Sequence, residues 1–492
     1  MKKIWEYIDK ILTGFWDCFS TEKSFHWFVT AVLGMMLRSD TLGVSSIVRG
    51  LRLKPNKYES LVNFYRSKAW KLLDIICCWL KIVYNTGLVV HSDGKPILIG
   101  DAVKQNKEST RMPCVKKMRQ ESEDSSKAEH IIGHMFGGLG ILIGNNVKKY
   151  CLPISMTLHD GCRPILEWLD SEYKNDSHVT RLVKEACHAA VTLGKACILL
   201  MDRAFLSVPA LKTILDEAKK AIRSQPIITL ITKAKSNAVA FGKPEPERDA
   251  NGNIVRHRGQ PKKKGDRVEL KKLFTSRAKD FITTELEMYG QMETVKYLCV
   301  DLLWGDGLYQ LLRFVLVVTY QYPQSILVCT DTTLDPTKII QLYTWRFSIE
   351  SCFKTFKQLI CGFGYHFWSD KVPLLSKWKS AKKTVEELAK DVAVESRDVV
   401  ISTYKAIEGF VMVSCVALGI LQMVALLYSE LINNAKPRWL RSFTKSVPSE
   451  ETTLVYLAES FPRILKLMPF MAITEIINSI RDEHIDYFED AA

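Results

Sequence analysis

The sequence predicts an α/β fold built around a mixed sheet, with helical regions before and after it along the chain. Short apolar segments typical of buried strands, such as residues 96–100 and 196–201, alternate with segments of helical periodicity. Residues 1–90 and 366–492 place apolar residues mainly at helical spacing. Between them, a polar, turn-rich and basic stretch at residues 243–272 leads into β-rich sequence. Three strands followed by alternating helices and strands are typical of a mixed sheet covered by helices.

The individual elements can be placed from apolar periodicity and turn signals. Strands are expected at residues 96–100, 140–143, 150–158, 196–201 and 227–232, and helices at 181–195 and 209–220. Two β-rich stretches, 281–302 and 309–330, precede a helix at about 336–359. The strand at 96–100 is expected to end at Asp101, and the strand at 196–201 at Asp202.

Charge and cysteine content narrow the class of protein. The 492 residues include 68 Lys and Arg against 54 Asp and Glu, a net charge of +14 that favours a polyanionic partner such as DNA. The 13 cysteines are scattered and form no C-x-x-C pair, which argues against a disulfide framework and a zinc ribbon. Glu6 and Asp9 interrupt the N-terminal apolar segment, so export is not expected. We therefore expect a reduced, cytoplasmic protein.

One segment has the length of a membrane span. Residues 409–429 contain no charged side chain. Ser414, Gln422 and the lack of a second such segment favour a buried helix within a large domain, and a membrane anchor remains the alternative.

The predicted helix at 336–359 carries a cluster of polar residues on one face. At 100° per residue, Tyr343, Arg346, Glu350 and Lys357 fall within about 60° of one another. A carboxylate flanked by two cations and a phenol suits a metal-bound phosphodiester. The alternative is a solvated surface with pairs such as Glu350 with Lys354.

Two aspartates earlier in the chain could join Glu350 of that helix at a metal site. Asp101 and Asp202 each follow a buried strand, and rigid strand ends can hold carboxylates that converge on divalent cations. Asp93, before the first strand, and Asp160, after the third, are rivals for the first position. Asp101 is preferred because of its position at a strand end.

These residues resemble the DDE-type transposases of bacterial insertion sequences. Tyr343-x2-Arg346-x3-Glu350-x6-Lys357 reproduces their Y-R-E-K signature. Residues 99–101 (Ile-Gly-Asp) resemble the strand with the first aspartate, and residues 199–205 the strand with the second. The order Asp, Asp, long insertion, Glu also fits, and the resemblance covers about residues 91–368.

The resemblance implies a ribonuclease H-like core interrupted by a β-rich insertion. Asp101, Asp202 and Glu350 would be the catalytic and metal-binding triad for Mg²⁺, with Mn²⁺ as an alternative. Tyr343, Arg346 and Lys357 would bind the transposon end. The enzyme would nick with water and then join the 3′-hydroxyl to target DNA.

It also implies an organisation and a set of partners. The expected regions are a helical DNA-end-binding region (1–90), the first part of the core (91–235), a basic β-rich insertion (236–332), the core helix with Glu350 (333–365) and a helical C-terminal region (366–492). The partners would be double-stranded terminal inverted repeats and target DNA, bound by a homodimer associated with the nucleoid, without a membrane.

Further DNA contacts are expected in the insertion. Trp304, next to Gly305-Asp306-Gly307, is a candidate for stacking on a flipped base, although an ordinary strand tryptophan is the simpler explanation. Residues 258–261 (Arg-Gly-Gln-Pro) resemble an element that enters A·T minor grooves. Arg258, Lys262, Lys263 and Lys264 are expected to collect phosphates without reading sequence, unless they form only a solvated loop.

The sequence argues against a zinc site and leaves two functions other than transposition open. His130 and His134 lack the H-E-x-x-H order and a cysteine partner, so a zinc site is not expected and a role in the fold is preferred for His134. A ribonuclease H-like nuclease without strand transfer and a DNA-binding descendant without catalysis remain the alternatives.

Overall fold

A computed structural model of the chain contains two compact units, each assembled from separated parts of the sequence. The structure describes residues 1–38, 40, 42–107, 109, 111–119, 129–221, 227–245, 262–319, 324–373, 385–437 and 446–481. Unit 1 comprises residues 1–90, 102–178 and 349–492, and unit 2 comprises 91–101 and 179–348. The fold is α/β with parallel and antiparallel strand pairs, as the sequence predicts.

Unit 2 is a mixed sheet with helices against it. Its strands are β1 (His91–Ser92), the first part of β2 (Lys95–Asn106), β6 (Cys197–Leu200), β7 (Ile228–Lys233), β8 (Val239–Phe241), β9 (Arg267–Glu269), β10 (Ile282–Met288), β11 (Gln291–Trp304), β12 (Gln310–Val318) and β13 (Ser325–Cys329). Its helices are α7 (His178–Leu193, from Val179 on), α8 (Val208–Lys220), α9 (Leu270–Ser276) and α10 (Pro336–Thr344), with 3₁₀ turns η2 (Arg203–Phe205), η3 (Ala278–Asp280) and η4 (Trp345–Phe347).

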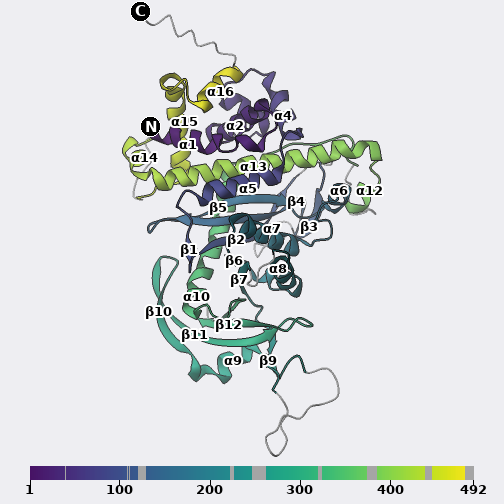
Figure 1. Cartoon of the computed structure of the whole chain (residues 1–492), viewed down its shortest axis with the longest axis vertical. Helices are drawn as coiled ribbons and strands as arrows, with labels where there is room; N and C mark the ends of the chain where they lie inside the picture. The colour runs from purple at the N-terminus through teal and green to yellow at the C-terminus, as the bar shows by residue number, and fades with distance from the viewer. Residues whose placement is uncertain are drawn as a thin grey trace, which may run out of the picture. The chain divides into compact units, whose positions relative to one another are not determined.

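Strands β2, β6 and β7 pair in parallel, and the rest of the unit 2 sheet is antiparallel. All four residues of β6 are buried, as expected for a parallel strand covered on both faces. An ideal Cβ at Gly100 would lie 3.4 Å from Leu182 Cδ2, so α7 packs closely on β2. Helix α10 contacts β7, β10, β12 and β13 and lies beside the antiparallel strands in Figure 1. This packing fixes the segment that leads to Arg346.

The described strands of the predicted insertion (236–332) continue the sheet of the preceding core. Strand β13 pairs with β7 through Leu327 and Lys233, and β12 and β11 follow. The connection from β11 to β12 turns at Gly305, where φ is +89°, a conformation that glycine adopts without strain. The sheet that carries Asp202 therefore extends into the β-rich sequence.

Unit 1 is mainly helical. Its helices are α1 (Lys2–Thr13), α2 (Glu22–Leu37), α3 (Val44–Gly50), α4 (Lys57–Arg66), α5 (Leu72–Tyr84), α6 (Arg163–Trp168), α11 (Ser348–Gln358, from Ile349 on), α12 (Val385–Lys390), α13 (Arg397–Leu427), α14 (Ser429–Ala435), α15 (Glu450–Leu467) and α16 (Ala472–Arg481), with 3₁₀ turns η1 (Trp16–Cys18) and η5 (Val394–Ser396). Its strands are the end of β2, β3 (Lys116–Arg119), β4 (His130–Gly144) and β5 (Lys149–Leu158).

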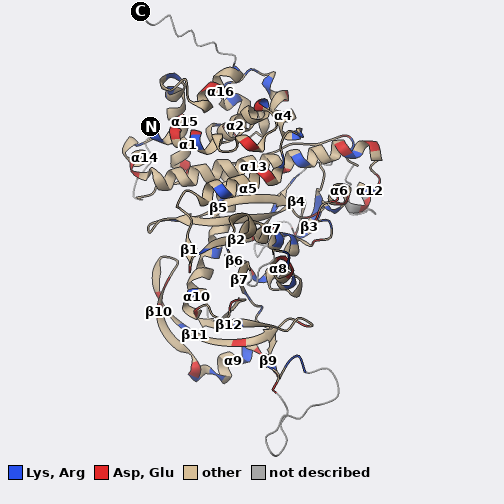
Figure 2. Ribbon diagram, in the orientation of Figure 1, with Lys and Arg blue, Asp and Glu red and all other residues tan. Residues whose placement is uncertain are grey.

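Helix α13 is the centre of unit 1. It contacts β5, α2, α4, α5 and α15, and Figure 1 shows it running across the unit. Every residue from Ala406 to Leu426 is buried. Figure 2 shows its charged residues near the end that faces α12, while the half toward α14 has none. The buried Glu408 accepts a hydrogen bond from Leu158 N at 2.9 Å, which caps β5.

The apolar segment at 409–429 is part of this helix. Residues 394–427 are the one helical segment of the described chain that is long and apolar enough to cross a membrane, with a mean hydropathy of 2.5 over its most apolar window. Since 94% of that window is buried in the fold, it has the burial of a core helix in a soluble protein. Ser414 Oγ donates to Phe410 O at 2.8 Å, which satisfies the hydroxyl. The predicted buried helix is confirmed.

Two expectations about element ends were wrong. Strand β2 does not end at Asp101 but continues to Asn106, because its later residues belong to unit 1. The helix expected at 336–359 is interrupted by the 3₁₀ turn at Trp345–Phe347, which separates α10 from α11. The angular positions calculated for one straight helix therefore do not hold across that turn.

Candidate functional site

Asp101 and Asp202 lie at the same level on neighbouring parallel strands of unit 2. Ile97 pairs with Ile198, and Ile99 pairs with Leu200. Each aspartate follows the last of these pairs by two residues, so the register places them side by side. Asp101 lies on β2 and Asp202 lies two residues beyond the end of β6, so the two residues are neighbours at the same end of the parallel strands. The sequence predicted this pair, although for Asp101 the reason is strand register and not a strand end.

Lys233 occupies the same level on the third parallel strand. Ile231 of β7 pairs with Leu200, so Lys233 is in register with Asp202. Burial lowers the pKa of the Lys233 ammonium, and the charges of Arg203 and Arg346 lower it further. Lys233 was not predicted from the sequence. The available signal was its position at the end of a buried strand, at the edge that also carries Asp202.

Two residues of the Y-R-E-K signature lie at these aspartates. Arg346 Nη1 is 3.1 Å from Asp101 Oδ2, and both side chains are less than one-fifth exposed. Burial raises the pKa of the Tyr343 hydroxyl, and the negative charges of Asp202 and Asp101 contribute in the same direction. The phenol therefore stays protonated and remains a hydrogen-bond donor. Asp202 also organises its own turn, since Oδ1 accepts a hydrogen bond from Ala204 N at 2.8 Å.

A hollow of about 330 Å³ in unit 2 adjoins this group. Its lining includes Asp202, Arg203, Lys233, Tyr343, Arg346 and Tyr289. Three of these side chains are cations and two are phenols, so the hollow suits an anion that also accepts hydrogen bonds. A phosphodiester has that chemistry.

The other two signature residues belong to unit 1. Glu350 is exposed in the first turn of α11. Lys357, in the last turn of the same helix, donates from Nζ to Lys104 O at 3.2 Å. Asp101 and Asp202 fit a divalent cation as hard oxygen ligands. Within the described ranges, no three or more His, Cys, Asp or Glu side chains group closely enough to hold a metal ion.

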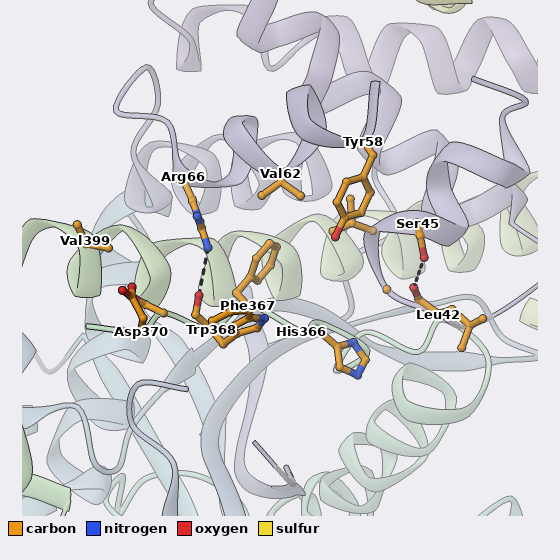
Figure 3. A pocket seen from close by; sticks show the side chains of 13 residues that line it. Leu42, Ser45, Tyr58, Val62, Arg66, His366, Phe367, Trp368, Asp370 and Val399 are labelled. Carbon is orange, nitrogen blue, oxygen red and sulfur yellow. Dashed lines mark hydrogen bonds between the residues drawn. The ribbon is translucent and has the colours of Figure 1, made fainter. Parts of the chain in front are cut away.

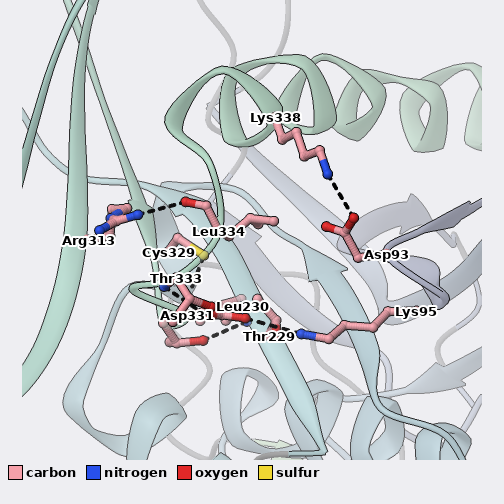
Figure 4. A network of polar contacts seen from close by, with 11 residues as sticks. Asp93, Lys95, Thr229, Leu230, Arg313, Cys329, Asp331, Thr333, Leu334 and Lys338 are labelled. Atoms are coloured by element: carbon pink, nitrogen blue, oxygen red, sulfur yellow. Dashed lines mark hydrogen bonds and ion pairs between the residues drawn. The ribbon is translucent and has the colours of Figure 1, made fainter.

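The rival aspartates have other partners. Asp93 lies in the turn before β2 at a φ of +50°, and its Oδ1 is 2.7 Å from Lys338 Nζ of α10 (Figure 4). Asp160, after β5 in unit 1, has Oδ1 2.7 Å from Lys116 Nζ and accepts a hydrogen bond from Gly161 N. Neither is in register with Asp202.

The same region of Figure 4 shows how the parallel strands are tied to the segment before α10. Lys95 Nζ lies 3.1 Å from Asp331 Oδ2 and 3.4 Å from Thr229 Oγ1. Asp331 Oδ1 also accepts a hydrogen bond from Thr333 N at 3.0 Å. These contacts hold β2, β7 and the segment before α10 together.

The predicted DNA contacts of the insertion lie apart in the sequence and differ in environment. Trp304 is half-buried at the end of β11, opposite Gln310. Lys264 Nζ lies 4.2 Å from the centre of the Phe241 ring, so it is held by a cation–π contact. Lys262 and Lys263 are exposed, and Arg258 lies outside the described residues.

His134 has a structural role in unit 1. Its Nδ1 is 2.6 Å from Tyr365 Oη, and its Nε2 is 2.8 Å from Pro113 O. Complete burial lowers its pKa to about 3, with a contribution from the charge of Lys107. His130, at the start of the same strand, is exposed.

This burial predicts acid sensitivity. Below pH 6.5 the unfolded chain binds a proton at His134 that the folded chain does not bind until about pH 3. The free energy of unfolding of wild type should therefore fall relative to His134→Gln as the pH drops from 6.5 toward 4, by at most about 1.4 kcal/mol per pH unit. Urea titrations across this range measure the difference. His130→Gln is the matched control, and equal pH dependence for all three proteins would contradict the assignment.

The described part of the site thus combines two carboxylates, three cations and two phenols at one edge of a parallel sheet. The aspartates, Tyr343 and Arg346 were predicted from sequence, and Arg203 and Lys233 were not. No protein-family model matches the sequence, and a search of curated proteins finds no significant match.

Proposed function

We propose that the protein is a DDE-type DNA transposase with a ribonuclease H-like core. The observation that carries the proposal is the parallel pairing of β2 with β6, since Asp101 and Asp202 each follow the last residue pair of these strands by two residues. Arg346 and Tyr343 of the Y-R-E-K signature lie at the same two carboxylates, next to a cationic hollow. Phosphoryl transfer on DNA needs this combination of metal ligands and phosphate-binding groups.

The roles of the residues follow from their chemistry. Asp101, Asp202 and Glu350 would hold Mg²⁺ or Mn²⁺, which when bound supplies activation of a water or 3′-hydroxyl and stabilisation of the leaving oxygen. Arg346, Lys233 and Arg203 neutralise the scissile phosphodiester and its neighbour. Tyr343 donates a hydrogen bond to a phosphate oxygen, because its raised pKa keeps the hydroxyl protonated. Strand cleavage with water and joining of the 3′-hydroxyl to target DNA would use the same groups.

Further regions of the chain would bind DNA and pair two copies of the protein. The basic residues Lys262, Lys263 and Lys264 supply further phosphate contacts, and Trp304 a stacking surface. The helices of residues 1–90 would bind the terminal inverted repeats, and two copies of the chain would bridge two ends. The site of action would be the nucleoid.

An excision assay tests this function. A marker flanked by the gene's own genomic ends is supplied with wild type or with Glu350→Gln, which removes the carboxylate charge with little change in shape. We expect excision by wild type and a loss of at least about a thousandfold in the variant, because a metal ligand is removed. Glu451→Gln is the matched control, since Glu451 is also an exposed glutamate in the first turn of a helix of unit 1.

The outcomes separate the alternatives. Equal excision by wild type and Glu350→Gln, at equal protein level, would contradict the role of α11. Binding of the ends without excision by any variant would identify a DNA-binding descendant. Cleavage of end DNA without joining would identify a nuclease.

A further inference from the structure

Unit 1 contains a second pocket, formed by elements that the proposed catalytic role does not use. Its volume is about 520 Å³, which is within the range of pockets that hold small ligands. The lining comes from the chain before and at the start of α3, from α4, from residues 366–370 and from one residue of α13 (Figure 3). Its lining includes Ser45, Tyr58, Arg66, His366, Trp368 and Asp370.

Two aromatic rings of this pocket remain in contact with solvent. Trp368 is 59% exposed and Tyr58 is 45% exposed. They come from segments far apart in the sequence, and Figure 3 shows both side chains at the hollow. Large exposed aromatic side chains that gather at a concavity mark a binding site, because a planar ligand can cover them. His366 adds a third exposed ring on the lower side of the pocket in Figure 3.

Arg66 supplies a cation with an unused donor. Its Nη2 donates to Trp368 O at 3.3 Å. Its Nε is buried and has no hydrogen-bond partner within the described part of the chain. Arg66 lines the pocket and is only half-buried, so the outer nitrogens of its guanidinium are open to a ligand there. An anionic oxygen is the acceptor that a guanidinium binds best.

The remaining polar groups of the pocket fit the same class of ligand. Asp370 Oδ2 lies 3.3 Å from Lys371 Nζ, and Arg111 donates to Asp370 O at 2.7 Å, so cations offset the one carboxylate. Ser45 Oγ, which donates to Leu42 O at 2.8 Å, keeps lone pairs for a donor on the ligand (Figure 3). The pocket thus offers aromatic faces, a cation and hydrogen-bonding groups within one hollow.

We propose that this pocket binds a nucleotide, with the base against Trp368 and Tyr58 and the phosphate on Arg66. Stacking on an aromatic side chain is available to every base, and a phosphate oxygen is the acceptor that a guanidinium binds best. Two sources share this chemistry: an unpaired nucleotide of a DNA strand and a free mononucleotide. The proposal goes beyond the proposed catalytic function and does not require it.

Photo-crosslinking of the full-length protein tests the proposal. A single-stranded oligonucleotide with one 5-iodouracil is irradiated with the protein in EDTA, so that no metal-dependent cleavage takes place. Mass spectrometry of the digest should place the crosslink on Trp368 or Tyr58. A crosslink confined to other aromatic residues, or none above the level of free iodouracil, would overturn the proposal.

Affinity measurements with variants test how much each pocket residue contributes to nucleotide binding. Fluorescence anisotropy of a labelled oligonucleotide should show Trp368→Ala weakening binding by about tenfold through loss of one stacked base, and Arg66→Gln by about tenfold through loss of a charge-assisted hydrogen bond to phosphate. Trp368→Ala should not weaken the binding of an oligonucleotide that lacks the base at the crosslinking position, because no base is left to stack on Trp368. Trp16→Ala is the matched control, since Trp16 is 49% exposed elsewhere in unit 1. Equal weakening by Trp16→Ala would overturn the site, and thermal melts confirm that each variant is folded.

Competition distinguishes the two sources of the nucleotide. If dTMP displaces the oligonucleotide at a concentration near the oligonucleotide's own Kd, the pocket is a mononucleotide site. If dTMP competes only at far higher concentration, the pocket holds a nucleotide within a strand. The proposed function is unaffected by either result, because its assay depends on Mg²⁺ and on Glu350, and this assay depends on neither.

Discussion

Asp101→Asn and Asp202→Asn should each lower the rate of transposon-end cleavage about a thousandfold. Asp101 lies on β2 and Asp202 follows the end of β6, its parallel neighbour, so each would contribute an anionic oxygen to the same divalent cation. A bound metal supplies several kcal/mol of charge stabilisation in the transition state, and about 4 kcal/mol corresponds to about a thousandfold in rate. The measurement is single-turnover cleavage of a duplex that carries the element's terminal repeat, in Mg²⁺.

The rival aspartates provide the controls. Asp93→Asn and Asp160→Asn remove the same charge at surface ion pairs with Lys338 and Lys116, and their cleavage rates should stay within a few fold of wild type. A thousandfold loss in Asp160→Asn with normal activity in Asp101→Asn would show that the first aspartate was assigned wrongly. Far-ultraviolet circular dichroism of the four variants excludes unfolding as the cause.

Trp79→Ala should lower the free energy of unfolding by about 3–5 kcal/mol, the largest stability effect that we expect from one substitution in unit 1. The Trp79 side chain is completely buried on α5, and its Nε1 donates to Pro153 O of β5 at 3.0 Å. The ring fills the space beside Gly419 of α13, where an ideal Cβ would lie 2.3 Å from Trp79 Cζ2. Removal of the indole leaves a cavity among three elements and an unpaired carbonyl.

Urea denaturation of the variant gives this difference directly. Trp16→Ala is the matched control, because that ring is half-exposed on η1 and packs mainly against Phe25. It should lose about 1 kcal/mol or less. A similar small loss in Trp79→Ala would mean that α5, β5 and α13 do not form one core in solution.

Local sequence patterns predicted the elements of the site well where apolar periodicity is uninterrupted. Residues 196–201 and 227–232 were expected as strands, and β6 and β7 lie within two residues of these bounds. The helix at 209–220 and the buried helix at 409–429 were also predicted, since apolar residues dominate both patterns. The strands and the helix at 409–429 were predictable because their burial is nearly uniform, and the helix at 209–220 because its buried residues recur at helical spacing.

The features of the fold and site that the sequence did not predict depend on contacts between residues far apart in the chain. Nothing in residues 102–106 shows that β2 continues, because that half of the strand is stabilised by partners from elsewhere in the chain. The 3₁₀ turn at Trp345–Phe347 follows no proline or glycine, so no breaker signal marks it. Lys233 gains its position from the register of β7 on β6, which a single sequence does not reveal.

The assembly of unit 1 from three separated stretches has a consequence for synthesis on the ribosome. Helices α2 and α5 emerge early, but the helix that covers their apolar faces, α13, ends only at Leu427. At about 5–20 residues per second, the interval between residues 84 and 427 lasts roughly 20 to 70 s. During that time the nascent chain exposes apolar surface with no native partner, while every part of unit 2 has been made by residue 348. We therefore expect unit 2 to fold first, and chaperones that bind the nascent chain to engage residues 22–84 until α13 is complete.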